Sequence, residues 1–254
     1  MKISRIQQAL SGGRPAFGIC VMWPAPGIIE AVGGAWDFIW IDAQHGMHDY
    51  GSLAECIRAC DLAGTSALVR VPGHAYDLIG PVLDLAPAGI IAPMVNDPSE
   101  ARHLVECVRF APLGMRSFGG RRIIDLYGRD YVREANRCQL LVVQIETSRA
   151  VQNAEAIAAV EGLDAVFFGP DDLRVSLGLG MDAPLTEPPL SDMAGRVAAA
   201  ARKAGKFAMV PVGTAEAIRW VLKAGFSGCV VGSDVGFVKG GSAAALRLAE
   251  ELGC

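Results

Sequence analysis

Lysine is almost missing from this sequence of 254 residues, since none occurs between Lys2 and Lys203. The four later lysines, Lys203, Lys206, Lys223 and Lys239, lie on or beside expected helices or beyond the last expected strand. Enzymes that form a Schiff base with their substrate, or that hold pyridoxal phosphate, need a lysine amine where the chemistry takes place. The sequence offers no good candidate, which disfavours both classes.

Long apolar runs and an excess of positive charge are also lacking. No apolar stretch reaches the roughly 18 residues of a membrane-spanning helix. The opening segment, residues 1–10, is amphipathic and has no apolar centre of a signal peptide. Asp and Glu number 27 against 23 Lys and Arg, so the net charge of −4 gives no basic surface for nucleic acid. We expect a cytoplasmic protein that binds neither membranes nor nucleic acid.

The cysteines show no metal-binding or disulfide pattern. The chain has seven cysteines, an odd number, and no two of them have the CxxC spacing of a zinc site. Cys56 and Cys60 lie four apart on an expected helix, where a metal pair is conceivable. No other His or Cys stands nearby at ligand spacing, so packing as small apolar side chains is the favoured interpretation. A reducing compartment fits this cysteine usage best.

The sequence does contain a regular alternation of short apolar runs and helical patterns. Expected strands are 17–22, 38–41, 67–71, 89–95, two runs (140–146 and 165–172) that end in carboxylates, 207–212 and 228–231. Expected helices are 27–34, 49–63, 76–85, one from Asp97 with its capping aspartate, 192–204, 215–224 and 243–252. The stretches 111–126 and 178–191 interrupt the pattern as loops. Eight strand–helix units predict a single α/β domain over residues 1–254, a (β/α)8 TIM barrel. A doubly wound sheet is disfavoured because no Gly-rich dinucleotide motif follows the first strand.

Polar residues gather where the expected strands end, which in a barrel is one rim. They are Asp42, His45, Arg70, Gln144, Glu146 and Asp172. Each has a structural alternative: Arg70 as an ion-pair partner of Asp42 or Glu146, His45 as a loop bridge, and Asp171 or Asp172 as a helix N-cap. These alternatives do not explain why all of them meet at one end. The two carboxylates that follow buried strands predict a divalent-metal enzyme.

Several short motifs carry a family resemblance. They are Asp42-x-Gln-His45-Gly, Val-Arg70-Val-Pro, Ala92-Pro-Met-Val95, Gly114-x-Arg116, Gln144-Ile-Glu146-Thr and Gly169-Pro170-x-Asp172-Leu. In this order the chain, from about Ser4 to Leu252, resembles the class II, metal-dependent pyruvate aldolases of the 4-hydroxy-2-oxoheptanedioate aldolase type, in the aldolase/citrate lyase superfamily. The resemblance implies reversible aldol cleavage of 4-hydroxy-2-oxo acids through a metal-stabilised pyruvate enolate, with pyruvate or a related 2-oxo acid plus an aldehyde as substrates.

The resemblance also implies roles for individual residues. Glu146 and Asp172 match the two ligands of Mg²⁺, Mn²⁺ or Co²⁺, hard cations that accept oxygen ligands from a substrate. By the same resemblance, Arg70 would bind the keto oxygen and Gln144 would lie beside the metal. His45 and Asp42 would form an acid/base dyad. The backbone at Gly169, Pro170 and Asp171 would bind the substrate carboxylate. The resemblance further implies a homo-oligomer, a hexamer built from dimers that exchange the C-terminal helix 242–254.

Three residues depart from the family pattern: Gln44 removes a negative charge beside His45, while Cys20 and Arg174 bear on the aldehyde pocket and leave the aldehyde open. Gln44 stands where many relatives carry Glu, Cys20 where the type enzyme has an aromatic residue, and Arg174 where a small residue is usual. Two alternatives use the same site differently: decarboxylation of oxaloacetate, or carbon–carbon cleavage of a CoA thioester. A third is a barrel that binds an acidic metabolite without catalysis.

Overall fold

The expected strands close into one barrel. The computed structural model describes residues 1–251, in which eight parallel strands are hydrogen-bonded in sequence order and β8 lies beside β1. They are β1 (Ala16–Val21), β2 (Phe38–Asp42), β3 (Ser66–Arg70), β4 (Gly89–Ala92), β5 (Leu140–Ile145), β6 (Ala165–Phe168), β7 (Phe207–Pro211) and β8 (Gly228–Ser233). The prediction of a (β/α)8 TIM barrel is confirmed.

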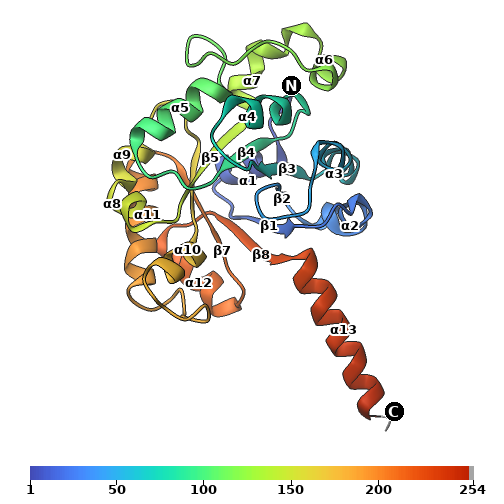
Figure 1. The fold of residues 1–254 in the computed structure, drawn as a ribbon, viewed down its shortest axis with the longest axis vertical. Helices are drawn as coiled ribbons and strands as arrows, with labels where there is room; N and C mark the ends of the chain where they lie inside the picture. The colour runs from blue at the N-terminus through green and yellow to red at the C-terminus, as the bar shows by residue number, and fades with distance from the viewer. Residues whose placement is uncertain (252–254) are drawn as a thin grey trace.

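Helices surround this barrel, as Figure 1 shows. In the described residues they are α1 (Arg5–Ser11), α2 (Pro26–Val32), α3 (Tyr50–Ala63), α4 (Tyr76–Asp84), α5 (Pro98–Val108), α6 (Arg121–Tyr127), α7 (Val132–Cys138), α8 (Ser148–Gln152), α9 (Ala154–Ala158), α10 (Pro170–Ser176), α11 (Leu190–Lys203), α12 (Ala215–Ala224) and α13 (Asp234–Glu251). Asp97 caps α5 as expected, because its side chain accepts hydrogen bonds from the Ser99 and Glu100 amides. No helix within residues 1–251 combines the length and apolarity required to cross a bilayer.

The strands are apolar on both faces because both faces are buried. Side chains that point into the barrel form one cluster, which includes Phe38, Leu68, Leu140, Phe167 and Met209. The alternate side chains pack outward against the helices in a larger cluster, which includes Ile39, Ile41, Val69, Val143 and Val166. Burial on both sides explains why the strands appear in the sequence as continuous apolar runs.

The N-terminal end of the barrel is closed by α1 and by a buried aspartate. Ile6 and Leu10 of α1 belong to the cluster inside the barrel. Asp37, just before β2, accepts two hydrogen bonds from Arg14 at 2.9 and 2.7 Å and one from the Phe17 amide at 3.0 Å. Burial raises the pKa of the Asp37 carboxyl, but these hydrogen bonds and the Arg14 charge outweigh it, so the pKa lies below its usual value.

The register of the strands sets which polar residues meet at the opposite, C-terminal rim. Asp42 at the end of β2 pairs directly with Arg70 at the end of β3. Cys20 of β1 pairs with Trp40 of β2, one inward position below. Parallel strands bring their carboxyl ends to the same side, so these residues and the ends of β5 and β6 share one rim.

Three expected boundaries are wrong. The stretch 111–126 is not wholly irregular, because α6 begins at Arg121. The last helix begins at Asp234, nine residues before the expected start, despite the glycines in its first turns. The run 165–172 is a strand only to Phe168, and α10 begins at Pro170 with Gly169 as its N-cap. Asp171 and Asp172 therefore occupy the first turn of α10 and neither is its N-cap. Figure 1 shows α13 extending away from the barrel; the end of the predicted exchanged segment, 252–254, lies outside the described residues.

Candidate active site

A cavity of about 1050 Å³ opens at the C-terminal rim. Five of the residues predicted from the sequence line it: Asp42, His45, Arg70, Pro170 and Asp171. Its floor includes inward-facing side chains of β1 and β2, and its walls come from the segments that follow β6, β7 and β8. The predicted rim and this cavity therefore overlap only in part, because Gln144, Glu146, Gly169 and Asp172 are not among its lining residues.

Arg70 is the centre of the polar network in this cavity. Its Nε and Nη2 atoms donate to the two Asp42 carboxylate oxygens at 2.9 and 2.5 Å. Its Nη1 atom donates to Gln144 Oε1 at 3.3 Å, and its guanidinium carbon lies 4.6 Å from the centre of the Trp40 ring. Burial raises the pKa of Asp42, but the hydrogen bonds and charge of Arg70 outweigh it and hold that pKa below its usual value. Both side chains are charged and fixed in orientation.

The expected pairing of the Asp42 carboxylate with the His45 imidazole is not formed. Asp42 Oδ1 instead accepts hydrogen bonds from the backbone amides of Gln44 and His45, at 3.0 and 3.3 Å. Gly46 completes this turn, because a Cβ there would lie 2.1 Å from the Asp42 carbonyl oxygen. The turn leaves His45 exposed at the cavity wall.

Glu146 follows β5 and is almost completely buried. Its Oε1 atom accepts a hydrogen bond of 2.6 Å from the Met94 amide, and Met94 has the left-handed φ of 55°. A Cβ on residue 169 would lie 2.6 Å from Glu146 Oε2, so only glycine fits there. Burial raises the pKa of Glu146 and the Asp172 charge adds to it, while the Met94 amide and Arg70 oppose this only in part.

These carboxylates fit a divalent cation. Within residues 1–251 neither Glu146 nor Asp172 forms an ion pair, although the charge of one acts on the other. No cluster of three or more His, Cys, Asp or Glu with metal-binding geometry occurs in the same residues. Glu146 is buried without an ion-pair partner and has only partial compensation from the Arg70 charge, while Asp172 is exposed in the first turn of α10. Two oxygen donors with further positions open suit a hard ion such as Mg²⁺ or Mn²⁺.

Arg174 lines the cavity, but its guanidinium group is already hydrogen-bonded to neighbouring residues. Its Nη1 atom donates to Asp171 at 2.7 Å, while Nε and Nη2 donate to the Ala183 carbonyl at 3.0 and 2.8 Å. It therefore fastens the long loop between α10 and α11 to the first turn of α10. The departure from the family pattern at this position acts on the loop that forms a wall of the cavity.

Sequence reasoning missed several residues of the site. Trp40 could have been found, because it lies two residues before Asp42 and so faces the same side of β2. Met94 could not, since its role comes from a backbone angle. Asp234, directly after β8, is buried and accepts hydrogen bonds from the Met22 and Trp23 amides, which fixes the loop after β1. Cys20 lines the cavity, and burial raises the pKa of its thiol, so it is an inert apolar contact.

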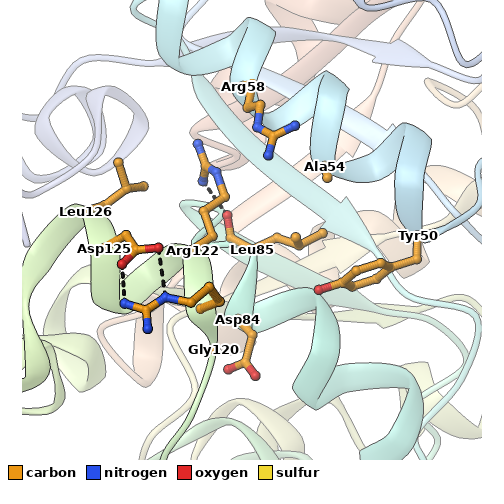
Figure 2. Close-up of a pocket in the computed structure, with 10 residues that line it drawn as sticks. Tyr50, Ala54, Arg58, Asp84, Leu85, Gly120, Arg122, Asp125 and Leu126 are labelled. Carbon is orange, nitrogen blue, oxygen red and sulfur yellow. Dashed lines mark hydrogen bonds and ion pairs between the residues drawn. The ribbon is translucent and has the colours of Figure 1, made fainter.

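A second hollow of about 800 Å³ lies on the outside of the barrel between α3 and α6. Figure 2 shows Arg122 beside Leu85, whose carbonyl accepts a hydrogen bond from it. Arg121 donates to Asp125. Arg58, on α3, forms an ion pair with Glu55. No residue predicted for the site lies in this hollow.

Comparison with known proteins places this architecture in a family. The sequence profile of HpcH/HpaI aldolase/citrate lyase matches residues 26–239. A 4-hydroxy-2-oxovalerate aldolase of Novosphingobium aromaticivorans is 38% identical over 180 residues, 70% of this chain and 69% of that protein. A hydroxypyruvate/pyruvate aldolase of Rhizorhabdus wittichii is 32% identical and covers 92% of this chain and 93% of its own.

A solved structure agrees with these relatives. The crystal structure of an HpcH/HpaI aldolase/citrate lyase family protein from Burkholderia cenocepacia superposes with a TM-score of 0.87 at 30% identity, over 96% of this chain and 98% of that one. The resemblance inferred from the motifs is thereby confirmed, and with it the prediction of an enzyme of the aldolase type.

Proposed function

Because the chain belongs to the HpcH/HpaI aldolase/citrate lyase family, we propose that it is a divalent-metal-dependent pyruvate-type aldolase. It would cleave 4-hydroxy-2-oxo acids reversibly to pyruvate, or a close 2-oxo acid, and an aldehyde. The observation that carries this proposal is the buried Glu146 carboxylate, whose pKa is raised by burial and by the charge of the exposed Asp172 and only partly lowered by Arg70. The whole chain, residues 1–254, is proposed to act as one domain.

Glu146 and Asp172 would hold Mg²⁺, Mn²⁺ or Co²⁺, and the ion would supply Lewis-acid stabilisation of negative charge on the bound 2-oxo acid. Removal of a C3 proton from pyruvate places negative charge on its keto oxygen. Arg70, fixed by Asp42 and Gln144, is placed to donate a hydrogen bond to that oxygen. The preformed orientation of Arg70 lowers the cost of stabilising this charge as it develops.

The remaining roles concern proton transfer and binding of the carboxylate. His45 is proposed to carry the proton to and from the hydroxyl derived from the aldehyde, because its ring is exposed at the cavity and histidine titrates near neutral pH. Asp42 then has a positioning role, because its carboxylate orients Arg70 and fixes the turn that carries His45. The backbone from Gly169 and Pro170 to Asp171 would receive the carboxylate of the 2-oxo acid.

Proton exchange at the pyruvate methyl group tests the proposal. Incubation of the protein with pyruvate and Mn²⁺ in D₂O should exchange the methyl protons, EDTA should stop the exchange, and added Mn²⁺ or Mg²⁺ should restore it. Glu146→Gln and Asp172→Asn should each abolish it. Glu161→Gln, at an exposed turn before β6, removes an equal charge and should leave it unchanged.

Two outcomes would assign a different function. Absence of exchange with every divalent metal, together with tight oxalate binding, would make the barrel a binding protein. Release of CO₂ from oxaloacetate much faster than any retro-aldol turnover would make it a decarboxylase.

We also propose a homo-oligomer in which α13 packs on a neighbouring copy, with a hexamer as the expected size. The support is that Leu246 and Leu248 are 61% and 64% exposed on a helix that leaves the barrel. A monomeric mass by light scattering would exclude this. The free thiols of the six described cysteines support a proposed location in the reducing cytoplasm.

A further inference from the structure

The charged groups of the cavity wall are unevenly distributed. Besides the Asp42–Arg70 and Asp171–Arg174 pairs, the wall contains the carboxylates of Asp182 and Glu216. Neither of the last two forms an ion pair within residues 1–251. They come from different segments, since Asp182 lies on the loop held by Arg174 and Glu216 in the first turn of α12.

The two arginines of the wall already have carboxylate partners. Arg70 has Asp42 and Gln144 as partners, and Arg174 has Asp171 and the Ala183 carbonyl. No lysine lines the cavity. A divalent ion at Glu146 and Asp172 would neutralise those two carboxylates and no others. The part of the cavity beyond the 2-oxo acid therefore has negative charge without a matching cation.

The same wall has unused hydroxyl groups. Ser233 Oγ accepts a hydrogen bond from the Gly236 amide and Thr214 Oγ1 from the Ala217 amide, each at 3.1 Å, which leaves both hydroxyl protons available. Thr186 adds a third hydroxyl to the lining. Hydroxyl donors beside carboxylate acceptors match a ligand whose hydroxyl groups both accept and donate.

We infer that the aldehyde partner of this enzyme is an uncharged hydroxyaldehyde and that the wall formed by Asp182 and Glu216 rejects aldehydes that carry a carboxylate. The inference rests on the proposed function and specifies its second substrate. Asp182 and Glu216 are both exposed to solvent. Like charges without a counter-ion repel an anionic ligand, here across the open mouth of the cavity. Met22, Val231 and Phe237 also line the cavity and would contribute apolar contacts for the carbon chain.

Matched pairs of aldehydes test this inference with the full-length, Mn²⁺-loaded protein and pyruvate. Succinic semialdehyde and its methyl ester differ chiefly in one negative charge, and the ester should have a kcat/KM at least tenfold higher. Glycolaldehyde and propanal have the same number of heavy atoms, and glycolaldehyde should be used several-fold better. Equal or better use of succinic semialdehyde, or of propanal, would overturn the inference.

Variants locate the source of the discrimination. In Asp182→Asn/Glu216→Gln the preference for the ester over the acid should fall at least fivefold. Glu187→Gln removes a charge from the same loop outside the lining, so its preference should remain that of the wild type. An unchanged preference in the double variant would overturn the role of these two residues.

Pyruvate exchange in D₂O separates the two proposals. Exchange accompanied by a preference for charged aldehydes overturns the inference alone. No exchange with any divalent metal overturns the proposed function, and the inference with it.

Discussion

Asp42 and Arg70 form a two-point ion pair across the ends of neighbouring strands β2 and β3, and both side chains are buried. The pair orients the guanidinium toward Gln144 and over the Trp40 ring. Arg70, which would stabilise the negative charge that develops on the substrate, is thus held in place by Asp42, whose carboxylate stays ionised.

Arg70→Met should be strongly destabilising, because it leaves the Asp42 carboxylate buried without its partner. The expected loss is about 3–5 kcal/mol in the free energy of unfolding. Urea denaturation followed by circular dichroism measures it. Arg58→Met, which breaks a pair in which both side chains are more than half exposed, should cost about 0–1 kcal/mol. Similar losses in the two variants would contradict a dominant role for burial.

Gly169→Ala should disrupt the metal ligand without exposing the core. The new Cβ would overlap both the carboxylate and the Cβ of Glu146, at 2.6 and 2.7 Å, so the carboxylate must move. Metal affinity by calorimetry should fall at least tenfold, and pyruvate exchange should fall with it. Gly195→Ala in α11 meets no atom within 4 Å and should instead stabilise the protein by about 0.4–1 kcal/mol. A Gly169→Ala protein with unchanged metal affinity would show that the backbone moves away freely.

The strands and most helices could be predicted from the sequence because their signals are local. The apolar runs of β5 and β6 are buried on both faces, and turn residues bound them. Where a signal was weak, the prediction was wrong. The Gly and Arg residues around Arg121 conceal α6, and three glycines conceal the first turns of α13. In α6 the buried Ile123 adds packing that helix propensity does not show, whereas in α13 Asp234 is the one buried residue among those described.

The candidate site could be predicted as a set of residues but not as a set of contacts. Alignment of strand ends at one rim follows from topology, so Glu146 and Arg70 could be placed together. The sequence offered Asp42 or Glu146 as the ion-pair partner of Arg70, and the β2–β3 register selects Asp42, while the turn directs His45 outward. The hydrogen bonds of Arg174 to Ala183 join segments whose relative position no local pattern encodes.

Asp37→Asn should weaken the protein in a pH-dependent way. The pKa of Asp37 is lower in the folded protein than its ordinary value of 3.8, so its contribution is fully present above that value and is lost as the pH falls through the lower, folded pKa. At pH 7 the variant should be less stable by about 2 kcal/mol, typical of hydrogen bonds to a charged group. The difference should shrink between about pH 4 and pH 2, as urea titrations at several pH values would show. A difference that grows on acidification would have the wrong sign.

Met94→Val should damage both stability and the site, because Met94 holds a backbone conformation that β-branched residues rarely adopt. Its φ is 55°, and its amide donates to Glu146 Oε1 at 2.6 Å. Valine should cost about 1–3 kcal/mol in the free energy of unfolding, and a displaced amide should lower pyruvate exchange several-fold. Met94→Gly accepts the same φ and should stay within about 1 kcal/mol of the wild type. Met47→Val, at a methionine that is 73% exposed with an ordinary backbone, should change neither quantity. If Met94→Val behaves like Met47→Val in denaturation and in exchange, the left-handed backbone at residue 94 does not support Glu146.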